Sequence, residues 1–212
     1  MKKYLFFLLM ILIITSCSPN LTRVACIGDS ITEGATLVNQ SETSYPRMLG
    51  HFLGPKYVVL NCGRSATTLQ KKGDFPYWIS KEFWNTFQFK PQIVVIKLGT
   101  NDTKPQNWVL GDFEKDYQAL LDTIRTMTPS PKIFVCLPVP VYESEWGIND
   151  STLVQGVLPI VKKLAERNKL TVIDLYHGMS NQPLNFPDHI HPNEQGAKNM
   201  AEIVARKILS VQ

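Results

Sequence analysis

An aspartate and two histidines stand within four positions in the stretch FPDHIHPNEQG, residues 186–196. Asp188, His189 and His191 could ligate a metal, form an acid–base pair, or belong to a polar loop without chemistry. A carboxylate three residues before a histidine can reach its imidazole and select the tautomer that a general base needs. Such a base needs a nucleophile. Ser30 in IGDSITEG is the candidate, because it lies just after an apolar run, on a predicted strand-to-helix turn.

The elements that must position these residues are visible as an alternation of two patterns. Continuous apolar runs, typical of parallel strands buried on both faces, predict strands at 23–28, 57–62, 93–99, 132–138 and 171–175. Amphipathic stretches between and after them predict helices near 43–53, 80–89, 113–124, 151–168 and 194–209. This alternation predicts a three-layer α/β/α sandwich around a five-stranded parallel sheet.

In such a sheet, ligands bind beyond the carboxyl ends of the strands. Ser30, Gly63 and Asn101 each follow a predicted strand. Gly63 lacks a Cβ, so its N–H can approach a ligand closely, and the Asn101 amide can donate to developing negative charge. Taken singly, each has a plainer interpretation: a Gly-Asp-Ser helix cap or an Asn-Asp turn. Gly63 and Asn101 are therefore candidates only as part of a set.

Four blocks in this order resemble those of the GDSL/SGNH hydrolases: GDSIT at 28–32, NCGRS at 61–65, GTND at 99–102 and DHIH at 188–191. The resemblance implies the flavodoxin-like fold of that family, with no metal or cofactor. Two departures are Ile31, where the family name has leucine, and Ala66, where a second glycine is frequent.

The resemblance also implies a role for each matching residue. Ser30 would be the nucleophile, His191 the base and Asp188 the carboxylate that orients it. The oxyanion hole would be formed by the backbone N–H groups of Ser30 and Gly63 and the side chain of Asn101. A metal site at Asp188, His189 and His191 would leave Ser30 and Asn101 without a role.

A second Asp-x-x-His pair, Asp174 and His177, ends the last predicted strand. The family's pair precedes the final helix, so we expect Asp188 and His191 to be the catalytic pair and the stretch HGMSNQ at 177–182 to form an ordinary connector. We expect His189 to be a loop or pocket-wall residue.

The stretch KLGTNDTKPQNW, together with EWGI at 145–148, resembles bacterial lipoprotein-type esterases that remove O-acetyl groups from sialate or other carbohydrates. We therefore expect a serine esterase that removes short acyl groups, chiefly acetyl, from carbohydrate hydroxyls. Trp78, Tyr142 and Trp146 lie in two loops that border the expected site and offer flat faces to a sugar, with core packing as the alternative. Alternative functions are a lysophospholipase or thioesterase acting on long acyl chains, and a surface lipoprotein that binds glycans without catalysis.

The N-terminal segment MKKYLFFLLMILIITSC has two lysines followed by an apolar run that is short for a membrane span. This pattern is typical of a secretory signal. Residues 14–17 resemble a lipobox. We expect a signal peptide at 1–16, a lipidated tether at 17–21 starting with Cys17, and one hydrolase domain at 22–212. The protein would then be exported and lipid-anchored in the bacterial cell envelope. An ordinary signal peptide or an uncleaved anchor is the alternative.

Charge and cysteine content argue against a nucleic-acid partner and a disulfide framework. After residue 16 the chain has 20 basic and 18 acidic side chains, without a basic run that would indicate a nucleic-acid partner. Three widely spaced cysteines, Cys26, Cys62 and Cys136, do not form a disulfide framework, and Cys26 and Cys136 are expected to be buried thiols. The sequence does not define the oligomeric state or the alcohol part of the substrate.

Overall fold

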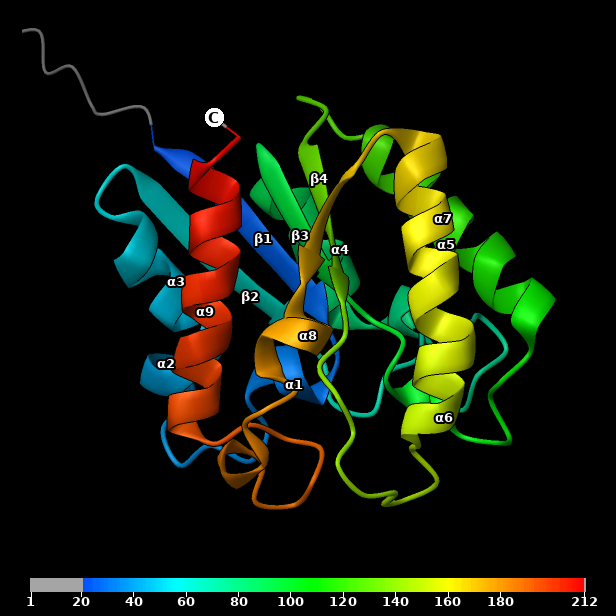
Figure 1. Ribbon diagram of the computed structural model, residues 1–212. Helices are drawn as coiled ribbons and strands as arrows, with labels where there is room; N and C mark the ends of the chain where they lie inside the picture. The colour runs from blue at the N-terminus through cyan, green and yellow to red at the C-terminus, as the bar shows by residue number, and fades with distance from the viewer. Residues whose placement is uncertain (1–20, 212) are drawn as a thin grey trace, which may run out of the picture.

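The computed structural model describes residues 21–211, so the predicted signal peptide and Cys17 lie outside the described residues. Its centre is one parallel sheet of five strands in the order β2-β1-β3-β4-β5 (Figure 1). The predicted fold class is confirmed, and each predicted strand is present with ends shifted by at most two residues. The strands are β1 (Thr22–Gly28), β2 (Tyr57–Gly63), β3 (Ile93–Lys97), β4 (Lys132–Leu137) and β5 (Thr171–Asp174).

Helices cover both faces of this sheet, as the alternating sequence pattern predicts (Figure 1). Helix α3 packs against α9 on one face, while α4, α5 and α7 lie over the other. The helices are α1 (Ser30–Glu33), α2 (Gln40–Thr43), α3 (Tyr45–Leu53), α4 (Lys81–Phe89), α5 (Leu110–Arg125), α6 (Asp150–Thr152), α7 (Leu158–Asn168), α8 (Leu175–Met179) and α9 (Glu194–Leu209).

The core follows from the continuous apolar runs. Strand β3 is buried along its whole length, because helices lie on both faces of the central strands. Cys26, Cys62 and Cys136 are buried free thiols, which confirms the prediction for the first and last of them. Lys97 is the exception within this core, since it is a fully buried lysine at the end of a strand of otherwise apolar residues.

Two predicted boundaries were wrong. The run 93–99 was expected to be strand throughout, but β3 ends at Lys97 and the chain turns at Gly99, whose φ of 119° is costly for other residues. The stretch 177–182 was expected to be an ordinary connector, but its first three residues belong to the short helix α8, which the Asp174 side chain caps through the His177 N–H.

All five strands run in the same direction, so their carboxyl ends form one edge of the sheet, and their first residues form the opposite edge. In residues 21–211, no helix has both the length and the apolar character needed to cross a bilayer. Gly63 ends β2, and the turns after β1 and β3 carry Ser30 and Asn101, so all three residues lie at the carboxyl edge.

Candidate active site

Ser30 is held at the carboxyl edge by a sharp strand-to-helix turn. Strand β1 ends at Gly28, and Ser30 is the first residue of α1. Asp29 caps this helix by accepting a hydrogen bond of 3.0 Å from the Ile31 N–H. A Cβ at Gly28 would lie 2.1 Å from the Thr32 hydroxyl oxygen, so the turn requires glycine there. The Ser30 hydroxyl therefore projects at the end of β1.

The loop before α9 brings a histidine and a carboxylate to this hydroxyl. The Ser30 Oγ lies 2.8 Å from Nε2 of His191, although 161 positions separate the two residues in the chain. His191 Nδ1 lies 2.7 Å from Oδ2 of Asp188. A proton on Nδ1 facing the carboxylate leaves Nε2 free to accept the Ser30 proton. The structure thus brings together the nucleophile, base and orienting carboxylate that the sequence predicts.

Asp188 is held by the backbone of its own loop. Its Oδ1 accepts from the N–H groups of Ile190 (3.1 Å) and His191 (2.6 Å). Burial raises the pKa of the Asp188 carboxyl, but these N–H bonds and the His191 side chain outweigh it and leave the pKa below its ordinary value. Asp188 is therefore ionised at neutral pH, as its orienting role requires.

The Gly63 N–H already has a partner. It donates to Oδ1 of Asn61 at 2.9 Å. The glycine at this position has a packing reason, because a Cβ on Gly63 would lie 2.1 Å from the backbone nitrogen of Glu33 in α1. Gly63 can therefore act as the predicted oxyanion donor only if Asn61 releases its N–H. Sequence reasoning about the missing Cβ did not anticipate this close approach between strand and helix.

Ala66, three residues further along the same turn, presents a different backbone geometry. Its φ of 63° lies in the left-handed region that favours glycine. Among residues 21–211, no protein acceptor binds its N–H. This is the position where a second glycine is frequent in the resembling family, so the departure noted in the sequence changes the side chain without removing the left-handed turn.

Asn101 begins a single 3₁₀ turn after β3 and is buried. One N–H of its side-chain amide donates to the Thr67 carbonyl at 3.1 Å, which orients the group. Because the amide carries two N–H groups, a second donor remains for a ligand. The first N–H groups of α1, including that of Ser30, have no partner within their helix. Ser30 and Asn101 therefore retain the donor capacity predicted for them.

A buried ion pair lies behind the nucleophile, and sequence reasoning missed it. Lys97 Nζ contacts both carboxylate oxygens of Asp29, at 2.9 and 3.0 Å, and the Thr100 hydroxyl at 2.9 Å. Burial lowers the pKa of Lys97, and the Asp29 carboxylate opposes that shift. The lysine thus links the residue before Ser30 to the residue before Asn101. The sequence feature that could have revealed this ion pair is a single charged residue within an apolar strand.

A second buried carboxylate, Asp102, supports the loop after β2. It accepts from the backbone N–H groups of Leu69 (2.9 Å) and Gln70 (2.8 Å). Burial raises the pKa of Asp102 to about 6, against the opposing effect of these bonds. The GTND block therefore supplies a donor in Asn101 and a loop anchor in Asp102.

The predicted substrate-binding aromatics divide into two groups. The Trp146 ring lies 5.9 Å from the His191 ring between centroids and is 61% exposed. Trp78 instead donates through its indole N–H to the Leu69 carbonyl at 2.8 Å. The Tyr142 hydroxyl binds the Met179 carbonyl, and its ring packs on Phe186. Of the three, only Trp146 has a ring contact with a residue of the predicted triad, His191.

His189 lies apart from the relay. Its Nε2 is 3.6 Å from a carboxylate oxygen of Glu143, and its backbone N–H donates to the Phe186 carbonyl at 2.9 Å. Its φ of 67° places it in a left-handed turn, which separates its direction from that of His191. Within the part of the chain that the structure describes, no three His, Cys, Asp or Glu side chains are grouped as metal ligands.

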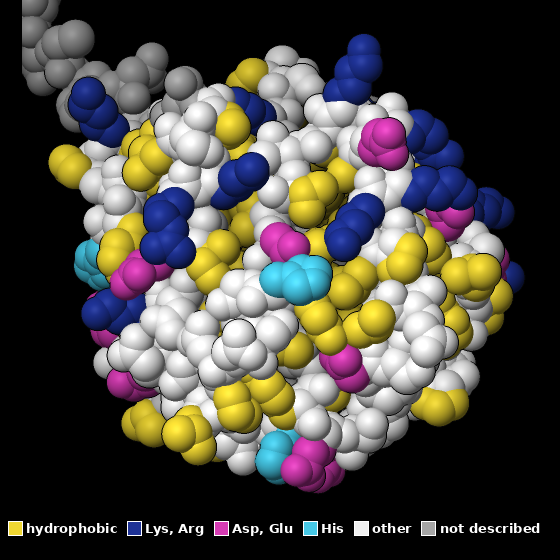
Figure 2. Space-filling view, in the orientation of Figure 1, with side chains coloured by type: hydrophobic (Ala, Val, Ile, Leu, Met, Phe, Trp, Pro, Cys, Tyr) yellow, Lys and Arg dark blue, Asp and Glu magenta, His cyan; other side chains and the backbone are white. Residues whose placement is uncertain are grey.

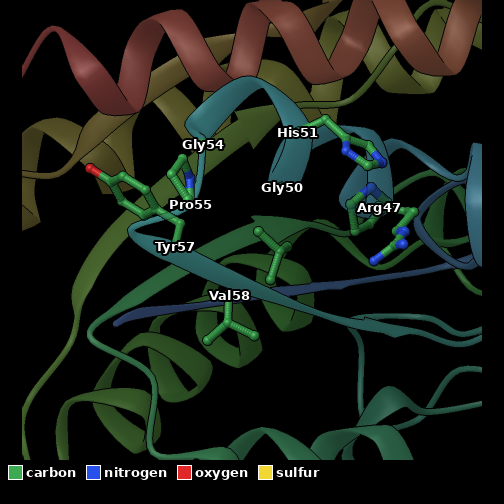
Figure 3. Close-up of a pocket in the computed structure, with 9 residues that line it drawn as sticks. Arg47, Gly50, His51, Gly54, Pro55, Tyr57 and Val58 are labelled. Atoms are coloured by element: carbon green, nitrogen blue, oxygen red, sulfur yellow. The ribbon is translucent and has the colours of Figure 1, made fainter. Parts of the chain in front are cut away.

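Two surface hollows differ in their relation to the triad. One is partly lined by Leu37, Val38, Asp188 and His191, so it opens at the catalytic pair. The other lies between α3 and the edge strand β2, with His51 and Arg47 at one end and Tyr57 at the other (Figure 3). The second hollow holds no member of the triad, and only the first is a candidate for substrate.

Comparison with known proteins identifies the family. The profile of the GDSL-like Lipase/Acylhydrolase family matches residues 26–198, which span all four blocks. The chain belongs to this family. It is also 40% identical over 205 residues to an acetylxylan esterase of Xylanibacter ruminicola, with 88% of this chain and 43% of that protein covered. The chain thus spans less than half the length of this relative.

Solved structures share the fold. Est24, a carbohydrate acetylesterase from Sinorhizobium meliloti, superposes with a TM-score of 0.76 at 21% identity and covers 90% of this chain and 100% of its own. The aryl esterase of M. Smegmatis gives a TM-score of 0.75 at 22% identity, covering 91% of this chain and 100% of its own. The three-layer sandwich around the Ser30 edge is therefore an arrangement already seen in esterases.

Proposed function

We propose that this protein is a serine esterase that removes acetyl groups from carbohydrate hydroxyls through an acyl-enzyme. The observation that carries the proposal is the continuous contact from Ser30 Oγ to His191 Nε2 and from His191 Nδ1 to Asp188, at 2.8 and 2.7 Å. A nucleophile, a base and an orienting carboxylate in hydrogen-bond contact form the arrangement that acyl transfer requires.

The reaction has two halves. Ser30 Oγ attacks the acetyl carbonyl as its proton moves to His191 Nε2, and the oxyanion accepts from the Ser30 N–H and the Asn101 amide. A third donor would be the Gly63 N–H once Asn61 releases it, or the Ala66 N–H of the same turn. The ester C–O bond then breaks as His191 protonates the departing sugar hydroxyl. Water attacks the acetyl-serine with His191 as base, which releases acetate and restores Ser30.

Two observations support an acetylated carbohydrate as the substrate. The Xylanibacter ruminicola relative is an acetylxylan esterase. The exposed Trp146 ring beside His191 offers a flat apolar face next to the reacting ester, and such faces stack on sugar rings. The loop at 139–150 near the site carries charged side chains, including Glu143 and Glu145, which are poorly suited to contact a long acyl chain.

The test is a substrate series with one chromogenic alcohol and acetyl, butyryl and octanoyl groups. We expect kcat/KM to fall steeply with acyl length, and the Ser30→Ala variant to be inactive on all three. Trp146→Ala should reduce turnover of acetylated xylan more than turnover of the small acetate, with Trp84→Ala, exposed on α4, as the matched control. Equal or higher rates on the octanoyl ester would instead support a long-acyl hydrolase.

The finer assignment, to lipoprotein-type esterases that act on sialate, is part of the proposal. Its support is the resemblance of KLGTNDTKPQNW and EWGI to that subclass. Acetylated sialic acid and acetylated xylan, compared at equal acetyl concentration, would separate the two sugar classes. A higher kcat/KM on xylan would assign the enzyme to the xylan class.

The cellular placement is also part of the proposal: export, followed by lipid attachment at Cys17. The lipobox-like residues 14–17 after an apolar run support it. Cys17→Ser should release the protein from the membrane fraction or leave an unprocessed precursor. Processed Cys17→Ser protein that still sediments with membranes would overturn lipid attachment.

A further inference from the structure

The end of the domain opposite the active site is basic. This basic end consists of the helix-to-strand loops, the first two residues of each strand and the last four residues of α3, α4, α5, α7 and α9. It holds nine Lys or Arg side chains and two carboxylates, Asp122 and Glu166. The rest of residues 21–211 holds eleven basic and sixteen acidic side chains. On the face of the molecule drawn in Figure 2, most Lys and Arg side chains lie in the upper part of the picture. The strands begin in the same part of Figure 1.

Helix dipoles explain only part of this charge. Arg125, Arg167, Arg206 and Lys207 lie in last helical turns, where the macrodipole favours cations. Three of them have carboxylate partners: Asp122 at 3.4 Å from Arg125, Glu114 at 3.7 Å from Arg167 and Glu202 at 3.9 Å from Arg206. With three of the four cations paired, this group leaves little net charge.

The other five basic side chains lie beyond the last turns, in loops and at strand starts. Within residues 21–211, no carboxylate lies within ion-pair distance of any of them. Four are exposed and Arg23 is half-buried. An exposed, uncompensated group of this kind is suited to a partner with distributed negative charge. The five are Arg23, Lys56, Lys90, Lys132 and Lys169.

The position of the N-terminal tether indicates which partner. Strand β1 begins at the basic end, at Thr22, and only the five residues 17–21 separate it from the proposed lipid on Cys17. Five residues span at most about 17 Å even when extended. A lipid at Cys17 would therefore hold the basic end close to the membrane surface. Anionic headgroups attract such side chains over about one Debye length.

We propose that the basic end is a membrane-facing surface that binds anionic lipid headgroups and directs the active site away from the bilayer. The choice of a membrane as the partner and the orientation both rest on the proposed lipid attachment at Cys17, whereas the charge of the basic end does not. Strand β1 has seven residues and is about 23 Å long. With β1 upright on the bilayer, Ser30 would accordingly stand about that far from the headgroups, open to a polymeric carbohydrate.

The binding surface is tested with residues 18–212, which contain the whole sheet and both helical layers but no lipid. This protein should co-sediment with phosphatidylcholine vesicles that contain phosphatidylglycerol, more strongly at low salt, and not with phosphatidylcholine alone. A combined variant with Gln in place of Lys56, Lys90, Lys169 and Lys207 should bind at least about tenfold more weakly. Its rate on a chromogenic acetate should be unchanged, which shows that it is folded.

The matched control carries Gln at four exposed lysines outside the basic end: Lys72, Lys81, Lys115 and Lys198. It should bind the anionic vesicles within twofold of the parent. Equal losses in the two variants would show a nonspecific charge effect and overturn the proposal. So would binding to soluble polygalacturonate through the same four lysines without binding to vesicles.

Orientation is tested with the lipidated protein in anionic vesicles that carry a headgroup-attached quencher. A fluorophore at Ser210→Cys, at the basic end, should be quenched. One at Leu184→Cys, which is 91% exposed in the loop that precedes Asp188, should not be. Equal quenching at both positions would overturn the orientation. Because esterase activity is measured separately, failure of either test leaves the proposed reaction unaffected.

Discussion

Two Asp-x-x-His segments of this protein have nearly the same local structure and different surroundings. In both, the aspartate accepts from the histidine N–H through Oδ1 and from its ring Nδ1 through Oδ2, at 2.7 Å. His191 and Asp188 have side chains 12% and 30% exposed, against 65% and 44% for His177 and Asp174. Nε2 of His191 lies 2.8 Å from Oγ of Ser30. Local geometry alone therefore does not distinguish a catalytic pair from a helix cap.

The difference between the pairs arises from where the chain places them. Asp174 ends the edge strand β5, three strands away from β1, whereas the loop carrying Asp188 returns to the end of β1 before α9 begins. The Asn101 amide and the Trp146 ring also lie near the end of β1. The following predictions test whether these surroundings, rather than the pair itself, carry the chemistry.

The largest expected difference is between the two histidines. His191→Ala should lower kcat on a chromogenic acetate by about 10⁴ to 10⁶, because no other base reaches Ser30 in the described structure. His177→Ala should change kcat by less than about twofold. Circular dichroism would verify that both are folded. A His177→Ala enzyme as inactive as His191→Ala would show that the wrong pair has been assigned.

Replacing the aspartate of each pair with asparagine compares the two pairs by a smaller chemical change. Asp188→Asn should lower kcat by about 10² to 10⁴, because the amide can no longer stabilise the imidazolium or select its tautomer. Asp174→Asn should leave kcat within about twofold, since asparagine caps a helix as well as aspartate does. Comparable kcat values for the two variants would mean that the Asp188 carboxylate is not needed.

The third test removes a donor that only the catalytic location has. Asn101→Ala should lower kcat by about 10² to 10³ with KM little changed, because the amide acts on charge that develops in the transition state. The Thr67 carbonyl also loses its 3.1 Å contact, so the thermal midpoint must be measured in parallel. A loss in kcat of less than about threefold would exclude Asn101 from the oxyanion hole.

The smallest expected effect concerns stability against pH. The pKa of Asp188 in the folded protein lies below the ordinary value of an aspartate. Ionised Asp188 therefore stabilises the fold at pH values above that ordinary value, and this stabilisation is lost as the pH falls through the folded pKa. Wild type should therefore exceed Asp188→Asn in free energy of unfolding at neutral pH. We expect at most about 1 kcal/mol, since water screens this partly exposed group. The gap should close below about pH 4, and chemical denaturation at several pH values would measure it. A gap that widens on acidification would contradict the assigned direction.

Much of this protein was determined by the sequence alone, because the signals are local. Continuous apolar runs must be buried on both faces, which predicts parallel strands between helical layers. Asp188 and His191 are three residues apart, so their contact needs only one loop turn. The order of the four blocks placed Ser30, Gly63 and Asn101 at one edge.

The tertiary structure decided what depends on distant backbone. It joined Ser30 to His191 across 161 positions and left His177 in solvent. It also brought α1 so close to the end of β2 that a Cβ on Gly63 would not fit. Lys97 became an internal link between Asp29 and Thr100 because β3 is covered on both faces and its ammonium group is paired inside the protein. A residue's type and spacing define what chemistry it can perform, while the packing of remote segments decides whether a partner is within reach.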